Sequence, residues 1–476
     1  DPSLLCTRAY VAGEWVNAAD GATFPVTNPA RGDVIAEVAD LGVAEVRRAI
    51  DAAHTAQKEW AAKTGKERAA VLRRWNDLMV ENADDLGRIL TAEMGKPFAE
   101  GKGEIMYGAS FLEWFSEEAK RVYGETIPGH QPDKRLIVVK QPVGTVASIT
   151  PWNFPNAMIA RKVAPALAVG CSFVARPAKE TPLSALSMAL LAERAGVPKG
   201  LFSVITSSRA SAVGKEFCDN PKVRKLTFTG STEVGRILLE QGAQQVMKMS
   251  MELGGNAPFI VFDDADLDRA VEGAMVSKFR NSGQTCVCAN RIYVQAGVHD
   301  ALVEKRRAAT TAMKVGDGLE AGVMQGPLID GDAVAKVQEL LDDAKAKGGS
   351  VACGGQPHAL GGSFYEPTVI TGATQDMAFA KEEIFGPLAP VFKFETEEEA
   401  ISMANDTVFG LASYAYTSDL GRAFRLNAGL KYGMIGINSG LITTVEAPFG
   451  GLKESGLGKE GGHQGIEDYL DTKYVC

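Results

Sequence analysis

Two cysteines separated by a single residue, Cys286 and Cys288, are the first candidates for chemistry in this sequence. They follow the polar run 281–285, in which Gly283 allows the backbone to approach a ligand closely. A cysteine is a nucleophile as its thiolate, near positive charge or hydrogen-bond donors and open to its reaction partner. Because a lone cysteine is more often a small buried side chain, this segment needs support from the rest of the chain.

A carboxylate in a second glycine-containing segment is a candidate base. Glu252 is flanked by apolar residues and precedes the pair Gly254-Gly255 and the apolar run 258–262. An isolated glutamate is usually solvated at the surface. Burial at this turn would instead raise the pKa of the carboxyl group towards values that suit a general base.

Residues 228–231, Phe-Thr-Gly-Ser, have the pattern of a strand that ends in a turn before a helix. Ser231 can cap that helix, and the free amides and dipole at its start suit a phosphate group. The spacing differs from the Gly-x-Gly-x-x-Gly pattern of dinucleotide sites, so a plain helix cap is the alternative.

The elements around these segments alternate between strand and helix. Buried strands are predicted at 143–149, 172–176, 201–205 and 225–228, and helices at 155–169, 181–195, 209–219 and 231–242. This alternation predicts right-handed βαβ units and a parallel sheet. Such sheets bind ligands beyond the carboxyl ends of their strands.

The remaining segments complete the predicted organisation. Residues 9–40 form short strands and turns, and three amphipathic helices follow, with apolar stripes over 46–60, 71–79 and 105–115. The isolated apolar run 136–140 suits an arm or an edge strand, and residues 293–430 repeat the strand/helix alternation of a second α/β domain.

Composition excludes several classes of protein. A chain of 476 residues predicts two or three domains, and its net charge of −9, without a Lys/Arg-rich run, argues against a nucleic-acid partner. The longest uncharged run, 141–160, contains three prolines and is unsuited to a membrane helix. Seven sparse cysteines and no visible signal peptide predict a reducing, cytoplasmic location. Five histidines without a His-Glu-x-x-His spacing predict no metal site.

Five ordered motifs resemble the aldehyde dehydrogenase superfamily. They are Pro-Trp-Asn-Phe-Pro at 151–155, Phe-Thr-Gly-Ser at 228–231, Glu-Leu-Gly-Gly at 252–255, Gly-Gln-Thr-Cys at 283–286 and Glu-Ile-Phe-Gly-Pro at 383–387. The longer segments 111–115, 278–281, 283–288 and 447–451 are similar to succinate-semialdehyde dehydrogenases in particular. The resemblance covers nearly the whole chain.

This resemblance implies a mechanism that agrees with the residue types. The Cys286 thiolate would attack an aldehyde carbon, and the Asn153 amide and the backbone N–H of Cys286 would stabilise the oxyanion. Transfer of hydride to the nicotinamide would leave a thioester, which water activated by Glu252 would hydrolyse. Taken alone, Asn153 could equally be a turn residue between two prolines.

The resemblance also implies a cofactor site across the parallel sheet. Gly230 and Ser231 would lie near the pyrophosphate, Trp152 and Arg176 on the adenosine side, and Glu383 and Phe385 at the nicotinamide ribose. The other residues expected in this site are Thr150, Pro151, Ala178, Lys179, Phe228, Thr229 and Leu253.

Two departures from the family pattern bear on the choice of cofactor. The family usually has Lys where this chain has Arg176, and its NAD-preferring members tend to have Glu where this chain has Lys179. An ammonium attracts a 2′-phosphate and a carboxylate repels one, so NADP is expected over NAD. In the alternative, Lys179 points to solvent and both cofactors work.

Substrate selection is expected to rest on charge. Arg161, Arg291 and Thr443 match the two arginines and the hydroxyl that hold the carboxylate of succinate semialdehyde in the family. Thr443 adds a methyl group to the usual Ser, and glutarate semialdehyde is the alternative substrate because one methylene discriminates weakly.

Cys288 is a candidate redox partner for Cys286, since some relatives with this Cys-x-Cys spacing form a reversible disulfide. A bridge between residues i and i+2 is strained and easily reduced. The alternative is a small packed side chain.

The expected architecture is α/β and aldehyde dehydrogenase-like, with three parts. They are a Rossmann-type cofactor domain (1–125 and 144–254), an α/β catalytic domain (255–445) and a small β oligomerisation arm (126–143 and 446–476). Homodimers or homotetramers are expected. A non-redox thioester or ester hydrolase and a non-catalytic binding protein remain as distant alternatives.

Overall fold

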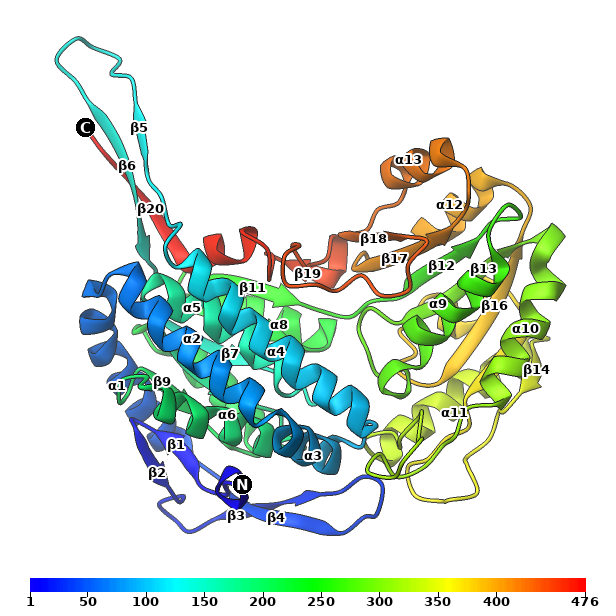
Figure 1. Cartoon of the computed structure of the whole chain (residues 1–476), viewed down its shortest axis with the longest axis horizontal. Coiled ribbons are helices and arrows are strands. Elements are labelled where there is room, and N and C mark those ends of the chain that lie inside the picture. The colour runs from blue at the N-terminus through cyan, green and yellow to red at the C-terminus, as the bar shows by residue number, and fades with distance from the viewer.

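A computed structural model describes all 476 residues. Two α/β lobes lie side by side, and a narrow arm projects from the first lobe (Figure 1). The first lobe contains an eight-stranded sheet and the second a seven-stranded sheet. Two lobes and an arm agree with the expected aldehyde dehydrogenase-like architecture.

The first sheet has the strand order β19-β11-β10-β7-β8-β9-β1-β2. Its strands are β1 (Ala9–Val11), β2 (Glu14–Val16), β7 (Thr145–Ile149), β8 (Ser172–Arg176), β9 (Phe202–Val204), β10 (Val223–Thr229), β11 (Lys248–Glu252) and β19 (Gly456–Leu457). The five strands from β11 to β9 are parallel, which confirms the predicted parallel sheet. The chain runs outward from β7 through β8 to β9 and then crosses back to β10. Strands β7 and β10 therefore form the switch point, where ligands bind in sheets of this kind.

The helices of the first lobe are α1 (Val43–Ala62), α2 (Gly65–Glu81), α3 (Ala83–Met94), α4 (Phe98–Glu118), α5 (Ala157–Val169), α6 (Pro182–Ala195), α7 (Ala210–Asp219) and α8 (Thr232–Ala243). The four helices predicted between the strands are confirmed. The sequence predicted three helices before them, whereas the structure has four. The helix α3 was missed, although Ala83, Leu86, Leu90 and Met94 form a buried apolar stripe on it.

The second sheet has the order β14-β15-β16-β13-β12-β17-β18 and is parallel except for β14. Its strands are β12 (Ala257–Val261), β13 (Ala289–Gln295), β14 (Ser350–Cys353), β15 (Thr368–Ala373), β16 (Leu388–Phe394), β17 (Ala412–Tyr416) and β18 (Met434–Ile437). Its helices are α9 (Leu267–Phe279), α10 (His299–Thr311), α11 (Gly331–Ala346), α12 (Glu397–Asn405) and α13 (Leu420–Gly429). This lobe confirms the predicted second α/β domain.

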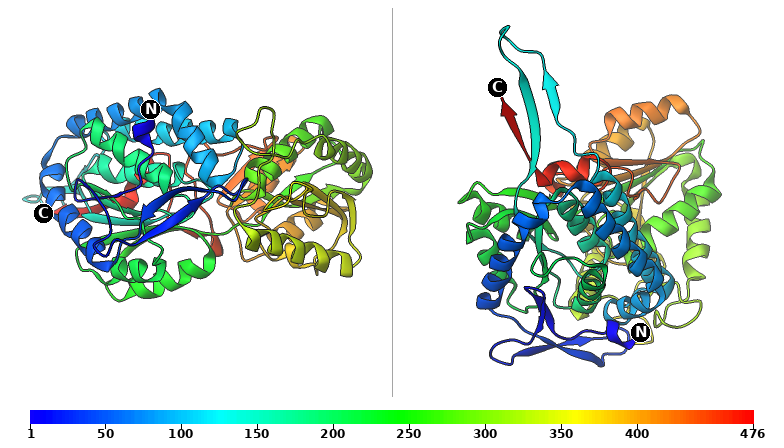
Figure 2. Two further views of the ribbon diagram at one scale, coloured as in Figure 1. Left: turned by 90° about the horizontal axis from the view of Figure 1, so that it is seen from below. Right: turned by 60° about the vertical axis from the view of Figure 1, so that its left-hand side comes forward.

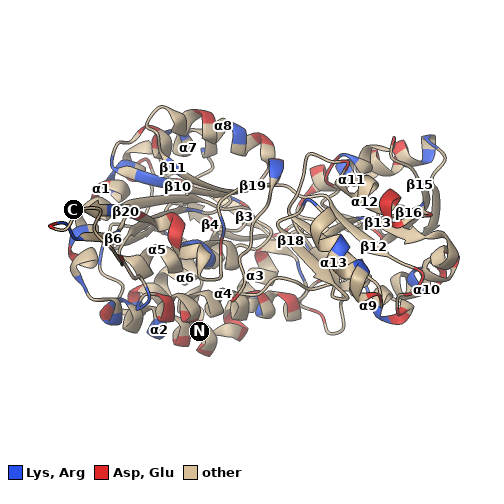
Figure 3. Ribbon diagram, turned by 90° about the horizontal axis from the view of Figure 1, so that it is seen from above, with Lys and Arg blue, Asp and Glu red and all other residues tan.

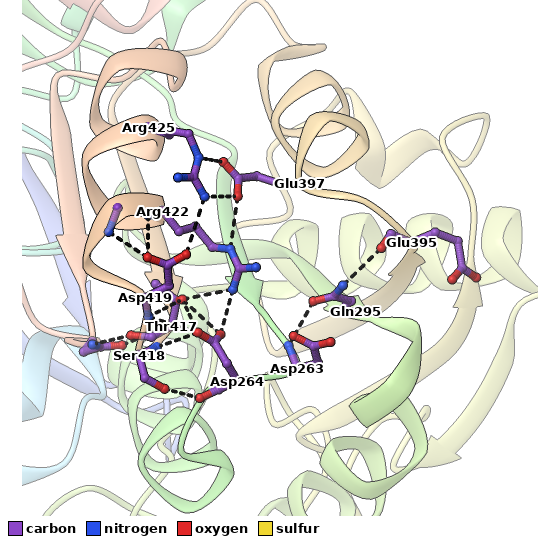
Figure 4. A network of polar contacts seen from close by, with 12 residues as sticks. Asp263, Asp264, Gln295, Glu395, Glu397, Thr417, Ser418, Asp419, Arg422 and Arg425 are labelled. Carbon is purple, nitrogen blue, oxygen red and sulfur yellow. Dashed lines mark hydrogen bonds and ion pairs between the residues drawn. The ribbon is translucent and has the colours of Figure 1, made fainter.

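Partly exposed ion pairs and hydrogen bonds join the loops at one end of the second sheet (Figure 4). The carboxylate of Asp264 accepts hydrogen bonds from the hydroxyl of Thr417 and from Arg422. Arg422 also pairs with Glu397, to which Arg425 donates two hydrogen bonds. The network ties the loop after β12 to α12 and α13, and so fixes the far side of the lobe that carries Cys286.

The arm is a three-stranded antiparallel sheet of β5 (Glu125–Ile127), β6 (Leu136–Pro142) and β20 (Leu470–Val475). The right-hand view of Figure 2 shows that these strands extend beyond the body of the molecule. The arm boundary predicted at residue 446 lies too early, because β19 pairs with β11 in the first sheet. A separate hairpin of β3 (Thr23–Thr27) and β4 (Val34–Ala39) lies near the N-terminus.

Basic and acidic residues alternate along the outer helices of both lobes (Figure 3). No helix in the structure combines the length and the apolar character that a membrane crossing requires.

One buried cation in the second lobe has no partner. Arg306 in α10 is fully buried, and none of its three guanidinium nitrogens has a hydrogen-bond acceptor. Its guanidinium lies 5.5 Å from the ring centre of Phe279, and burial lowers its pKa to about 10. An uncompensated buried charge destabilises the folded state.

Replacing Arg306 by Met is therefore expected to stabilise the protein. An apolar side chain of similar length removes the desolvation penalty, and such replacements of buried charge gain about 1–4 kcal/mol. Thermal and urea denaturation should show a higher midpoint for this variant. The control is Arg307→Met, at an exposed site paired with Glu304, which should change stability by at most about 0.5 kcal/mol. A lower midpoint for Arg306→Met would contradict this account.

Candidate active site

A cavity of about 270 Å³ lies where the two lobes meet. It is lined by Pro151, Trp152, Asn153, Thr229, Gly230, Ser231, Leu253, Gly254, Cys286, Glu383 and Phe385. All of these except Gly254 are residues that the sequence predicted for the site. The first lobe contributes segments that follow the carboxyl ends of β7, β10 and β11. The second contributes segments that precede the amino ends of β12, β13 and β16.

The loop that carries Cys286 is conformationally strained. Asn281, Ser282 and Gly283 have consecutive positive φ angles of 53°, 57° and 79°. A left-handed conformation at a residue other than glycine costs about 1–3 kcal/mol, and such strain clusters at functional sites. Gly283 is required for space as well, since a Cβ at this position would lie 2.2 Å from the carbonyl oxygen of Gly386.

The thiol of Cys286 is protonated at neutral pH in this structure. Burial, and then the carboxyl groups of Glu383 and Glu252, raise its pKa to about 12, an effect that Arg161 and Arg280 partly offset. Reaction therefore requires removal of the thiol proton or an added positive charge nearby.

Glu252, the last residue of β11, is 3% exposed, and neither of its carboxyl oxygens has a hydrogen-bond partner. Burial, and then the neighbouring carboxylate of Glu460, raise its pKa well above the usual value. The desolvation that the sequence suggested for this residue is confirmed. An unpaired carboxyl group next to a thiol is suited to accept a proton from water or from the thiol.

A buried charged cluster stands behind Glu252 and was missed in the sequence. The ammonium of Lys162 donates to the hydroxyl of Thr229 at 2.6 Å and to Glu460, whose other oxygen lies 2.6 Å from Nε of Arg161. The signal that could have revealed it is the pair Arg161-Lys162 within the otherwise apolar helix α5, which is buried throughout. Glu460 lies in the segment 446–476, which the sequence assigned to the arm.

The two predicted oxyanion donors lie in the same cavity wall. Nδ2 of Asn153 donates to the carbonyl of Gln284 at 3.0 Å, which leaves its second N–H free. The backbone N–H of Cys286 donates to no protein group. Both donors are thus available to a ligand atom beside the thiol.

The residues predicted for the pyrophosphate form a tight turn at the start of α8. The hydroxyl of Ser231 caps this helix by accepting from the N–H of Val234, which confirms the predicted cap. A Cβ at Gly230 would lie 2.4 Å from the ring of Phe228, so the turn requires glycine there. Leu253 closes the same wall by packing against Gly235.

On the opposite wall, Glu383 and Phe385 precede β16. The carboxylate of Glu383 accepts from the backbone N–H of Gly255 at 3.0 Å, and burial raises its pKa to about 8. Phe385 has a positive φ of 49° and meets Trp152 edge to face at 5.6 Å. These two rings bring the lobes into contact across the cavity.

The residues predicted for the adenosine side lie at the carboxyl end of β8. Arg176 is 7% exposed, donates to the carbonyl of Ser207 at 2.9 Å and has no partner for Nε. Thr150 and Ala178 are buried beside it. The side chain of Lys179 is 59% exposed, and its ammonium lies 3.9 Å from a carboxylate oxygen of Glu180.

A second cavity, of about 200 Å³, is lined by Thr443 together with Phe449 and other residues of the segment before β19. The guanidinium of Arg161 lies 3.9 Å from the ring centre of Phe449, and Nη2 of this arginine has no partner. Cys286 packs against the same apolar cluster as Phe449. An unused guanidinium donor thus lies next to Phe449, which lines the cavity of Thr443.

The prediction that Arg291 binds substrate is wrong. Its guanidinium points into the second lobe, where it donates to the carbonyls of Asn256, Met403 and Ala404 and to the hydroxyl of Tyr432. The side chain is fully buried, and these structural bonds occupy it.

Arg280 is the second arginine near the thiol instead. It is partly exposed, its guanidinium lies 5.5 Å from the ring centre of Phe154, and it lowers the pKa of both Cys286 and Tyr107. Its position in the segment 278–281, already noted for its resemblance to relatives, was the available signal.

Cys288 is 1% exposed, and its thiol donates to the carbonyl of Lys278 at 3.2 Å. Burial raises its pKa. All seven cysteines are unpaired in this structure. This environment fits the packed side chain given above as the alternative, and a disulfide with Cys286 stays a prediction.

Comparison with known proteins shows which family this chain matches. Residues 15–475 match the aldehyde dehydrogenase family. Glutarate-semialdehyde dehydrogenase of Pseudomonas aeruginosa is 63% identical over 100% of this chain and 98% of its own length. A succinate-semialdehyde dehydrogenase of Escherichia coli whose name specifies NADP(+) is 59% identical over 100% of this chain and 98% of its own length.

The chain also superposes on the crystal structure of succinate-semialdehyde dehydrogenase from Burkholderia pseudomallei, with a TM-score of 0.99 and 59% identity. The match covers 100% of this chain and 98% of that chain. The match thus extends over both lobes, the arm and the cavity between them. The chain belongs to the aldehyde dehydrogenase family.

Proposed function

We propose that this protein oxidises succinate semialdehyde, or its longer homologue glutarate semialdehyde, to the dicarboxylate, with NADP preferred over NAD. The observation that carries the proposal is a thiol, Cys286, in the wall of the cavity between the lobes, with the unpaired buried carboxyl group of Glu252 and the guanidinium of Arg161 close enough to shift its pKa. The names of the relatives support both substrates, which differ by one methylene.

In the first half of the reaction, the thiol of Cys286 gives its proton to solvent, a loss that the charges of Arg161 and Arg280 favour. The thiolate sulfur then bonds to the aldehyde carbon, and the carbonyl oxygen becomes an alkoxide. The free N–H groups of Asn153 and Cys286 donate to this oxygen where its charge develops. A nicotinamide held in this cavity would supply the acceptor for the hydride of the former aldehyde C–H. The carbon then remains attached to Cys286 as a thioester.

In the second half, Glu252 takes a proton from water as the water oxygen bonds to the thioester carbon. The tetrahedral oxyanion uses the same two N–H donors. Cleavage of the C–S bond releases the carboxylic acid and returns Cys286 as a thiolate. The raised pKa of Glu252 makes it a stronger base than an ordinary carboxylate once it has lost its proton.

We propose that Arg161 and Arg280 bind the distant carboxylate of the substrate, and that the hydroxyl of Thr443 lies on the same path. Support comes from the unpaired Nη2 of Arg161 and the partly exposed guanidinium of Arg280, both near the thiol. Guanidinium groups suit carboxylates because their N–H donors match the two oxygens.

The residues fit a nicotinamide dinucleotide. The start of α8 offers backbone N–H groups, and Nε of Arg176 and Oγ1 of Thr150 are buried without partners. The exposed Val234 and Ile237 of α8 offer an apolar face for an adenine ring. Lys179, free at the surface, would attract a 2′-phosphate, although Glu180 offsets part of its charge.

We further propose the functional division into a cofactor domain (1–125 and 144–254), a catalytic domain (255–445) and an oligomerisation arm, in a cytoplasmic homodimer or homotetramer. Two unpaired edge strands, β20 on the arm and β18 in the second sheet, support the proposed role of the arm in oligomerisation. Tyr474 and Val475 on β20 are 63% and 52% exposed, as expected for side chains that a second subunit would cover.

The substrate proposal is tested with Arg280→Gln. Its KM for succinate semialdehyde should rise about 10- to 100-fold, because a hydrogen bond to a charged group contributes about 1.5–3 kcal/mol. Initial rates of nicotinamide reduction, with succinate and glutarate semialdehydes, measure this effect. Butanal, which has no carboxylate, is the matched control and should show no change in KM.

An equal rise in KM for butanal would instead indicate a general distortion of the site. No reduction of NADP or NAD by the wild-type protein with either semialdehyde would contradict the proposed function itself.

The cofactor proposal is tested with Lys179→Glu. A carboxylate here would repel the 2′-phosphate, so the KM for NADP should rise about tenfold or more while that for NAD changes little. Titration of each cofactor at saturating semialdehyde gives both constants. Unchanged preference would show that Lys179 does not contact the 2′-phosphate.

A further inference from the structure

Lys96 is a buried cation outside the cavity, between α3 and α4, and it is 1% exposed. Its ammonium donates to Glu104 at 2.7 Å and to the backbone carbonyl of Asn153 at 2.7 Å. It also lies 3.7 Å from the ring centre of Phe154. Two of its three contacts are thus with the loop that carries the proposed oxyanion amide.

The carbonyl of Asn153 also receives a hydrogen bond from the loop of the second lobe. Nδ2 of Asn281 donates to it at 3.0 Å and to the carbonyl of Gln284 at 3.1 Å. The side chain of Asn153 donates to the same carbonyl of Gln284 at 3.0 Å. These bonds close a ring that joins the Asn153 loop to the Cys286 loop, and Lys96 is bonded to one member of that ring.

Two carboxylates one turn apart on α4 support both loops. Glu104, which pairs with Lys96, accepts the backbone N–H groups of Asn156 and Ala157 at 2.9 and 3.1 Å. Glu100 accepts the backbone N–H of Asn281 at 2.8 Å, at the first of the three residues with positive φ. The helix α4 therefore holds the strained loop and the start of α5 at a fixed separation.

We propose that Lys96 is a positioning residue for the oxyanion hole: through Glu104 and the carbonyl of Asn153 it fixes the direction of the Asn153 side-chain amide relative to Cys286. The inference rests on the proposed function. An oxyanion donor acts only when it is held at the position where charge develops, and a displacement of about 1 Å can lower a rate about a hundredfold.

A residue in this role affects carbonyl chemistry while leaving other functions of the site intact. Lys96 has no hydrogen bond to Cys286, Glu252 or any residue of the turn at 228–231. Loss of its contacts should therefore lower kcat but leave the affinity for NADP and the reactivity of the thiol towards an alkylating agent unchanged. Alkylation of a thiol by iodoacetamide forms no oxyanion, and so it does not use the Asn153 amide.

The test is the double variant Lys96→Met/Glu104→Gln in the full-length protein. Removing both charges avoids leaving one buried and unpaired. We expect kcat with succinate semialdehyde to fall about 10- to 100-fold, with the KM for NADP and the rate of Cys286 alkylation within about threefold of wild type.

A comparison with Asn153→Ala distinguishes positioning from a merely structural effect. If Lys96 acts through Asn153, adding Lys96→Met/Glu104→Gln to Asn153→Ala should lower kcat no further, because the two changes remove the same interaction. The matched control is Glu93→Gln. Glu93 is fully buried on α3 and accepts from Leu183 and Ser184 at 2.7 and 2.8 Å, away from Asn153, so this variant should retain its kcat.

Three results would overturn the inference: an unchanged kcat in Lys96→Met/Glu104→Gln, a further full loss of kcat on top of Asn153→Ala, or a parallel fall in Cys286 alkylation. The single variant Lys96→Arg, which keeps charge and donors, should recover part of the lost kcat if the double variant folds poorly. Failure of the proposed function itself would appear separately, as a wild-type protein that oxidises no semialdehyde.

Discussion

Exclusion of water at the junction of the two sheets is the constraint on which the rest of the site depends. The carboxyl ends of β7, β10 and β11 meet segments that precede β12, β13 and β16, and this junction desolvates Cys286 and Glu252 together. Desolvation raises the pKa of both groups, so each group binds its proton more tightly than it would in water. If the thiol and the carboxyl group were exposed to water, each would have an ordinary pKa, and each would affect the pKa of the other less.

The energetic cost of this arrangement is distributed over the surrounding structure. Positive φ angles at Asn281 and Ser282 strain the thiol loop, and hydrogen bonds from Asn281 to Glu100, Asn153 and Gln284 offset that strain. Buried charges near the site are paired, as in Lys96–Glu104 and Lys162–Glu460. Arg306, away from the site, lacks such compensation.

Much of the fold and of the site could be predicted from the sequence, because strand–helix alternation and short motifs depend on neighbouring residues. The parallel sheet, the capped turn at Ser231 and the desolvated Glu252 are of this kind. Errors arose where the three-dimensional partner decides the role. Arg291 and Arg280 stand in one segment, and only the fold shows that the first bonds to carbonyls inside the second lobe. Likewise, Glu460 reaches the site through a pairing of β19 with β11 that no local pattern predicts.

The division of labour between Cys286 and Glu252 is the central claim, and rapid-mixing kinetics of Glu252→Gln with NADP and succinate semialdehyde tests it most directly. The account predicts a burst of about one reduced nicotinamide per site, followed by turnover about a hundredfold or more slower than wild type, because thioester formation persists while its hydrolysis lacks a base. Steady turnover close to that of the wild type would contradict the account. Absence of a burst in a variant whose Cys286 still reacts with iodoacetamide would contradict it equally, since Glu252 would then be needed before the thioester forms.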